Sequence, residues 1–69
     1  MDKLDKVIHG IVSEYNGRFG YIISDDNVRY DFAKDDISLD KPIQPDDSVI
    51  FRGEDHGREL KLARNILKR

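Results

Sequence analysis

Hydrophobic and polar residues alternate along 28–33, and a second stretch, 48–52, is apolar at its centre with Val49 and Phe51 on one face. A period of two residues is typical of a β-strand with one face buried and one face exposed. We therefore expect a strand in each stretch, with one set of apolar side chains turned toward a core. The side chains that the alternation directs inward are Val28, Tyr30, Phe32, Val49 and Phe51.

A hairpin is predicted before these two strands. Residues 7–15 and 18–24 are rich in β-branched and aromatic residues, and Asn16-Gly17 separates them. Both residues of this pair tolerate a positive φ, so they suit a two-residue type I′ turn.

A two-residue turn fixes the register of this hairpin. Phe19 and Tyr21 then share one face, and Ile22 takes the other face as the candidate for the interior. The expected cross-strand partners are Tyr15 with Arg18, Glu14 with Phe19, Val12 with Tyr21, and Ile11 with Ile22.

Turn-forming residues occupy most of 34–47, which we interpret as an irregular crossing. Within it, Asp35-Asp36-Ile37 suits a short helical or 3₁₀ turn near residues 35–38. A second polar turn, bracketed by glycines, is expected at 53–57.

The last segment has apolar residues at both strand and helix spacing. We interpret it as a strand that ends at Ile66 and is followed by a basic tail at 67–69. At the other end, residues 1–5 are expected to fray.

Five short strands with no helix long enough to cover them must shield their own apolar faces. The sequence therefore predicts an all-β fold, either a small barrel or two tight layers. A chain of 69 residues has enough apolar side chains for one core, so we expect residues 1–69 to form a single domain.

Composition and charge narrow the class of protein. The chain has no cysteine and no apolar run of membrane-spanning length, and its first six residues alternate in charge. These features favour a cytoplasmic protein. The net charge is −2, but residues 25–55 hold ten acidic and four basic residues, whereas residues 58–69 hold five basic and one acidic. This distribution predicts a molecule with an acidic and a basic side.

The sequence offers little support for catalysis. His9 and His56 are not at metal-ligand spacing, and the Asp-Asp pairs suit turns and caps better than a calcium loop. The nucleophile, phosphate-loop and dinucleotide motifs are also absent. We therefore expect a protein that is not an enzyme and needs no cofactor or metal.

The order of these elements and their residues resembles the cold-shock domain family. Residues 10–16 (GIVSEYN) reproduce the glycine, valine, aromatic residue and asparagine that open the family's first strand. Phe19-Gly20-Tyr21-Ile22 looks like the core of its first RNA-binding signature, and residues 30–37 (YDFAKDDI) are similar to its second. Two later landmarks, residues 49–51 (VIF) and 63–66 (ARNI), complete a match over most of the chain.

The resemblance implies a five-stranded antiparallel OB-type barrel that binds single-stranded RNA or DNA with little sequence preference. In that family the two aromatic residues of the first signature stack on bases, which here are Phe19 and Tyr21. Arg18 and Lys34 lie within the two signature segments and are the best candidates for phosphate contacts. Arg29 is a further candidate cation. For Tyr15 two roles remain open, because its ring either plugs the end of the barrel or extends the stacking surface.

Departures from the family pattern predict weak binding. Glu14 stands in place of an exposed tryptophan, Asp31 in place of a stacking phenylalanine and Ala33 in place of a histidine. Carboxylates beside a phosphate backbone repel it at low salt. The alternative is therefore a protein-interaction module whose acidic rim fits a basic protein partner. We expect a monomer, with a dimer as the alternative, and the sequence does not distinguish RNA from DNA.

Overall fold

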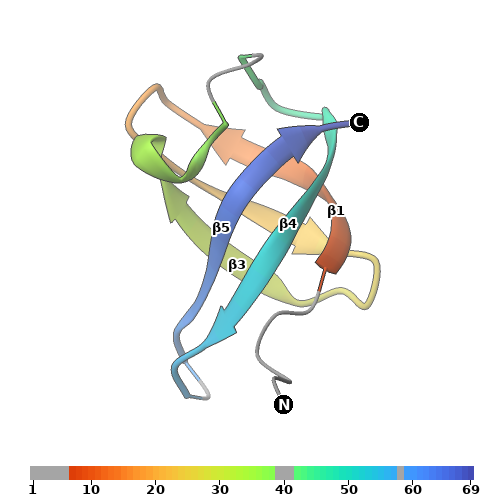
Figure 1. Cartoon of the computed structure of the whole chain (residues 1–69), viewed down its shortest axis with the longest axis vertical. Helices are drawn as coiled ribbons and strands as arrows, with labels where there is room; N and C mark the ends of the chain where they lie inside the picture. Colours follow the sequence, from red (N-terminus) through yellow and green to blue (C-terminus); the bar gives the residue numbers. More distant parts are fainter. Residues whose placement is uncertain (1–6, 39–41, 58) are drawn as a thin grey trace.

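The computed structural model describes residues 7–38, 42–57 and 59–69, so the expected fraying of residues 1–5 lies outside the described residues. Five strands form a closed barrel in the order β1-β2-β3-β5-β4, and one 3₁₀ helix lies beside it (Figure 1). This arrangement confirms the all-β barrel and the short turn expected near residues 35–38. The elements are β1 (Val7–Tyr15), β2 (Phe19–Ser24), β3 (Arg29–Ala33), η1 (Lys34–Asp36), β4 (Ser48–Asp55) and β5 (Lys61–Lys68).

Strand β1 joins the two halves of the barrel because it pairs with both β2 and β4. The barrel closes between β3 and β5, which run parallel and share the pair Asp31↔Leu62. An additional parallel bridge, Ile37↔Ile66, lies just beyond β3. The expectation of an antiparallel barrel therefore holds for every strand pairing except that of β3 with β5. The strand order is consistent with an OB-type barrel.

The interior of the barrel is filled by the side chains that the alternation directs inward. Tyr30 is half-buried and packs edge-on against Phe51, with ring centroids 5.0 Å apart. Val28 is also half-buried, just before β3 begins. The fully or nearly fully buried apolar residues are Val12, Ile22, Phe32, Ile43, Val49, Phe51, Ala63 and Ile66.

The register of the first hairpin differs from the prediction. Val12 pairs with Ile22 and Glu14 with Tyr21, so Ser13 is an extra residue that forms a β-bulge in β1. A bulge reverses the alternation of the residues that follow it. Val12, before the bulge, points into the core with its partner Ile22, and the bulge turns Glu14 outward beside Tyr21. All four expected pairs are therefore wrong: the observed partners are Ile11 with Ile23, Val12 with Ile22, Glu14 with Tyr21, and Tyr15 with Gly20.

The turn of this hairpin is also longer than predicted. Three residues, 16–18, separate β1 from β2, and φ is positive at Gly17 (98°) but not at Asn16. A type I′ turn requires positive φ at both central residues, so this turn is of another kind. Its loop is closed by the Asn16 side chain, whose Oδ1 accepts hydrogen bonds from the backbone N–H groups of Arg18 (2.9 Å) and Phe19 (3.0 Å).

Gly20 allows β1, β2 and a core ring to approach closely. A Cβ atom built at this position would lie 2.8 Å from Cζ of Phe32 and 3.0 Å from Cα of Tyr15, and would also collide with the carbonyl oxygen of Glu14. Only glycine fits without moving backbone. The Phe32 ring can therefore pack beneath β2 and leave Phe19 and Tyr21 on the outer face.

Strands β4 and β5 are longer than the sequence indicated. The predicted turn at 53–57 begins instead after Asp55, because Gly53 to Asp55 continue the ladder with β5. The predicted basic tail at 67–69 is largely strand as well. Leu67 pairs with Ile50 and Lys68 with Val49, and the backbone N–H of Arg69 donates to the carbonyl oxygen of Ser48 at 2.9 Å.

Two of the three Asp-Asp pairs, 35–36 and 46–47, bond to turn backbone through one carboxylate, as predicted. Asp36 Oδ2 accepts a hydrogen bond from the backbone N–H of Ala33 (2.9 Å), which fixes the start of η1. Asp47 Oδ2 accepts a hydrogen bond from the backbone N–H of Gln44 (3.0 Å) before β4.

Across the described ranges, the structure has no helix of the length and apolarity needed to cross a membrane.

Candidate functional site

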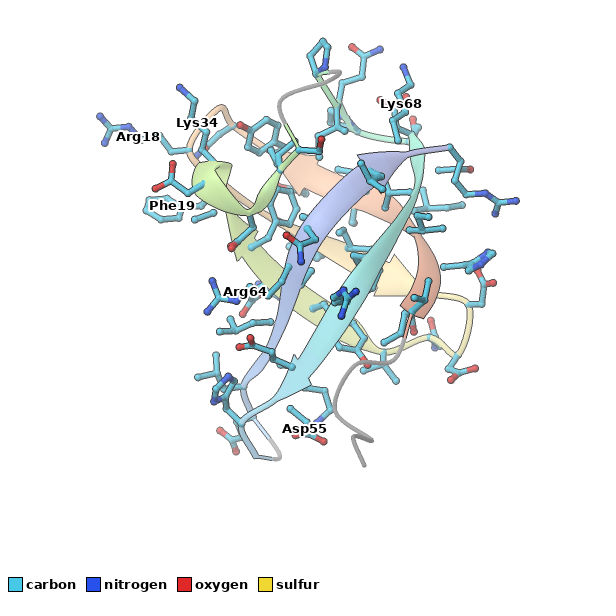
Figure 2. All side chains as sticks on the ribbon, viewed as in Figure 1. Arg18, Phe19, Lys34, Asp55, Arg64 and Lys68 are labelled. Atoms are coloured by element: carbon cyan, nitrogen blue, oxygen red, sulfur yellow. The ribbon has the colours of Figure 1, made fainter. Side chains whose placement is uncertain are left out.

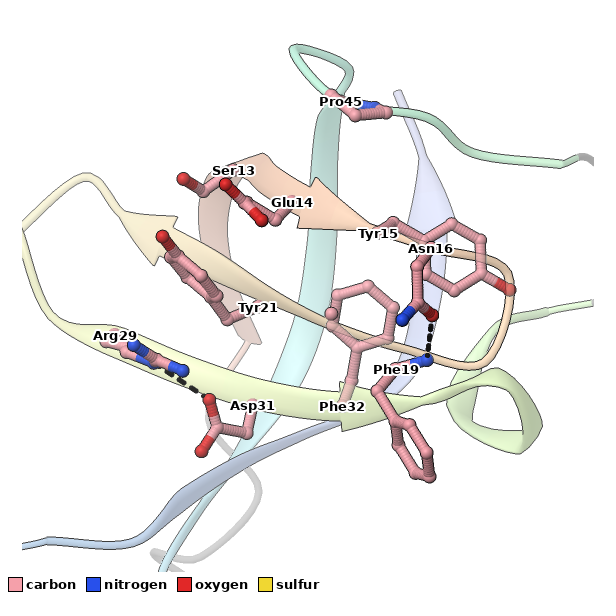
Figure 3. Close-up of a pocket in the computed structure, with 11 residues that line it drawn as sticks. Ser13, Glu14, Tyr15, Asn16, Phe19, Tyr21, Arg29, Asp31, Phe32 and Pro45 are labelled. Atoms are coloured by element: carbon pink, nitrogen blue, oxygen red, sulfur yellow. Dashed lines mark hydrogen bonds and ion pairs between the residues drawn. The ribbon is translucent and has the colours of Figure 1, made fainter.

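The outer face of β1, β2 and β3 carries a shallow depression, which we call the aromatic hollow (Figure 3). Its residues come from all three strands, from the β1–β2 loop and from Pro45 in the β3–β4 connection. The hollow contains four of the six candidate residues: Tyr15, Phe19, Tyr21 and Arg29. Its lining is Ser13, Glu14, Tyr15, Asn16, Phe19, Gly20, Tyr21, Arg29, Asp31, Phe32 and Pro45.

Phe19 is the most exposed large hydrophobic residue among those described, with 63% of its surface accessible. It lies at the start of β2 opposite Ala33, whose small side chain leaves the ring uncovered on that side. Burying an aromatic ring is favourable by several kcal/mol at most sites, so a ring held in solvent is available for a partner.

Tyr21 lies two residues further along β2 and is half-buried. The Arg29 guanidinium covers one face of its ring, with Cζ 3.9 Å from the ring centroid. Arg29 is itself held by Asp31, since its Nε donates to Asp31 Oδ1 at 2.9 Å. This hydrogen bond is the main reason that the pKa of Arg29 is raised above its ordinary value. One face of the Tyr21 ring is therefore covered by a guanidinium whose positive charge is paired with the Asp31 carboxylate.

Two carboxylates flank Tyr21 across the sheet. Tyr21 pairs with Glu14 on β1 and with Asp31 on β3, and side chains of directly opposed residues point to the same face. Asp31 is occupied by Arg29, whereas the exposed Glu14 carboxylate makes no hydrogen bond or ion pair within the described residues. The centre of the hollow is thus aromatic with an acidic rim.

Tyr15 lies between the core and the aromatic hollow. The bulge at Ser13 turns its ring inward, where it packs on Phe32 with centroids 5.4 Å apart. Tyr15 is half-buried and belongs to the residues around the core, yet it also lines the hollow. Through its contact with Phe32 it supports the floor of the hollow.

Arg18 and Lys34 lie beside the hollow rather than in it. The backbone N–H of Lys34 donates to the carbonyl oxygen of Arg18 at 2.8 Å, so the β1–β2 loop and η1 are joined at this end of the barrel. Both side chains are exposed, and they extend from the same end as Phe19 (Figure 2). Neither forms an ion pair with any residue that the structure describes.

The basic residues of β5 are paired instead of forming a basic side. Arg64 bonds to Asp36 (2.8 Å) and Glu54 (3.3 Å), which raises the pKa of Arg64, mainly through the hydrogen bond to Asp36. The other pairs are Lys61 with Asp55 and Lys68 with Asp47. The separation of charge along the sequence is therefore largely cancelled in the fold, because β5 lies against β4 and η1.

Three residues of the hollow were missed by the sequence reasoning: Ser13, Asn16 and Pro45. An asparagine before glycine at a hairpin does indicate a side chain that bonds to the loop backbone, so Asn16 had a local signal. Ser13 and Pro45 had none, because a bulge and a distant connection place them there.

Comparison with known proteins adds no assignment: neither a family model nor a curated protein matches the sequence.

No group of three metal-ligating side chains occurs in the described ranges. The chemistry that the hollow offers is flat contact on two rings, hydrogen bonding to carboxylates, and two neighbouring cations.

Proposed function

We propose that this chain is a divergent cold-shock-like barrel that binds single-stranded RNA or DNA at the aromatic hollow. The observation that carries the proposal is the pair of rings, Phe19 and Tyr21, on the outer face of β2, with Phe19 63% exposed. Side chains two residues apart on a strand are about 6.6 Å apart, so the rings can contact neighbouring bases of one strand. The motif resemblance supports the same function.

Phosphate contacts in this proposal come from Arg18 and Lys34. They are exposed, unpaired among the described residues, and located beside Phe19 (Figure 2). Stacking contributes about 1–3 kcal/mol per base in proteins of this kind. Two rings and two cations are a small site, and Glu14 repels phosphate, so binding is weak and sensitive to salt.

The test is a titration with oligothymidine at low salt, followed by backbone NMR. Binding at the hollow shifts the amide resonances of residues 18–21, and the double variant Phe19→Ala/Tyr21→Ala abolishes these shifts. Leu67→Ala is the matched control, because it removes an exposed apolar side chain (41% accessible) from β5, outside the lining of the hollow. The proposal fails if no resonance moves at high-micromolar oligonucleotide, or if the control loses binding as fully as the double variant.

A second candidate function is the binding of a basic protein partner. It is favoured by the row Glu14, Tyr21 and Asp31, since the Tyr21 ring and the Asp31 carboxylate already bind the guanidinium of Arg29. A pull-down from cell extract separates the two functions. Nuclease-sensitive recovery of RNA supports nucleic-acid binding, and nuclease-resistant recovery of one defined basic protein supports the alternative.

A further inference from the structure

The acidic rim of the aromatic hollow is a hydrogen-bond acceptor placed beside a stacking ring. We propose that it gives the site a base preference: the Glu14 carboxylate selects bases that present N–H donors, guanine above all, over thymine and uracil. This inference rests on the proposed function and adds to it the identity of the preferred base.

The geometry leaves one face of Tyr21 available. Arg29 lies against the ring on the side away from Phe19, with its Cζ atom 3.9 Å from the ring centroid, and Figure 3 shows Phe19 on the opposite side of Tyr21. A base that stacks on Tyr21 from within the hollow therefore does not need to displace Arg29. The hydrogen bond to Asp31 fixes the position of Arg29, which covers the other face of the Tyr21 ring.

Glu14 is the carboxylate within reach of such a base. It is the direct cross-strand partner of Tyr21 on β1, and opposed side chains on one face have Cβ atoms about 5 Å apart. In Figure 3 its carboxylate lies above the Tyr21 ring on the β1 side of the hollow. Asp31 already accepts the Nε–H of Arg29, whereas Glu14 has both oxygens free of any partner among the described residues.

The chemistry of base edges determines the preference. An ionised carboxylate only accepts hydrogen bonds, through two oxygens side by side. Guanine presents two adjacent donors, N1–H and the N2 amino group, that match this pair. Thymine and uracil present one N–H between two carbonyl oxygens, which a carboxylate repels. Adenine and cytosine each have one amino donor next to an acceptor nitrogen, so we expect them to rank between.

Repulsion between Glu14 and phosphate does not remove the preference. Every oligonucleotide carries the same phosphates, so this repulsion weakens all of them alike, whereas the base-edge contact differs from base to base. The carboxylate therefore lowers affinity and raises discrimination at the same time. This combination is the signature that separates a base-reading residue from a merely repulsive one.

The experiment compares short oligothymidine with the same oligonucleotide carrying one central guanine, by NMR titration or fluorescence anisotropy at low salt. We expect the guanine oligonucleotide to bind at least about fivefold more tightly, the lower end for a bidentate base contact. Inosine at the same position lacks the N2 amino group and is expected to fall between. Glu14→Gln should strengthen oligothymidine binding and reduce the guanine preference to less than about twofold, because the neutral amide removes both the repulsion and one acceptor oxygen.

The control variant is Asp26→Asn, which removes one negative charge from the β2–β3 turn, outside the lining of the hollow. It should leave the guanine preference unchanged. Equal affinity for the two oligonucleotides, or a preference that survives in Glu14→Gln, overturns this inference while the proposed function stands. Absence of binding by every oligonucleotide overturns the proposed function and the base preference with it.

Discussion

The two sides of this barrel use their charged residues differently. On the side formed by β4, β5 and η1, the cations Lys61, Arg64 and Lys68 each lie against a carboxylate. Around the aromatic hollow, on β1, β2 and β3, Arg29 is paired with Asp31. Glu14, Arg18 and Lys34, the first residue of η1, have no ion-pair partner among the described residues.

This difference indicates that paired charged residues contribute to the stability of the fold, whereas unpaired ones are available to bind a partner. A cation already bonded to a carboxylate must give up that bond before it contacts phosphate, whereas an unpaired cation need not. Conversely, an unpaired surface charge adds little to the free energy of unfolding. We therefore expect substitutions at the Arg64–Asp36 pair, where Asp36 is largely buried, to change stability, and substitutions of Arg18, Lys34 and Glu14 to change binding. The following predictions test that separation.

The largest effect is expected at Asp36, which joins η1 to β5. Asp36→Ala removes the acceptor of the Ala33 N–H and the partner of Arg64. An unsatisfied, partly buried N–H and a lost ion pair together cost about 2 kcal/mol, or a drop in Tm of roughly 10 °C for a domain of this size. Thermal unfolding followed by circular dichroism measures this change.

The neighbouring Asp35→Ala is the matched control for this prediction. Asp35 is exposed and forms no ion pair within the described residues, so its removal should change Tm by little. Equal losses of stability in the two variants would show that the bonds of Asp36 are not what holds η1 against the barrel.

A smaller effect is expected on the salt dependence of oligonucleotide binding. Two cations in contact with a single strand give a slope of log affinity against log salt of about −1.4. Arg18→Gln/Lys34→Gln should bring this slope close to zero. Lys61→Gln/Lys68→Gln removes the same charge from the paired side and should leave the slope unchanged. Similar slopes in the two double variants would contradict the assignment of the phosphate contacts.

The smallest effect is expected from pH on the paired side. Hydrogen bonds from His56, and then from Arg64, hold the pKa of Glu54 below its ordinary value of 4.5. A lowered pKa in the folded state means that the contribution of Glu54 to stability is present above the unfolded pKa. It is lost as the pH falls through the folded pKa.

The corresponding measurement compares Tm of the native chain and Glu54→Gln between about pH 6 and about pH 3. The native chain should be the more stable of the two at the upper end, and the difference should shrink toward the lower end. A difference that does not depend on pH would show that the Glu54 contacts are not ionic.

The sequence predicted those parts of the fold that depend on neighbouring residues. Alternation placed Phe32, Val49 and Phe51 in the core, and Ile22 opposite the face that carries Phe19 and Tyr21. These predictions are confirmed because a strand turns successive side chains to opposite faces whatever it pairs with. Alternation alone placed Phe19 only on the face opposite Ile22, and the expectation that its ring is exposed came from the resemblance to the cold-shock domain family.

The register of the hairpin and the pairing of charges could not be read in this way. The bulge at Ser13 exists because β1 must pair with β2 and β4 at once while the barrel closes, and no local residue pattern encodes that demand. It places Glu14 beside Tyr21 instead of Phe19, and so determines the acidic rim of the hollow.

By itself, then, the sequence determined where most of each strand lies and which side chains share a face, since these depend on the pattern of residues within a strand. Only the tertiary structure decided which charges stay free. Arg64 meets Asp36, 28 residues away in the sequence, because β5 closes the barrel beside η1. Burial and charge pairing across such distances depend on the whole fold, and they leave Arg18, Lys34 and Glu14 around the hollow.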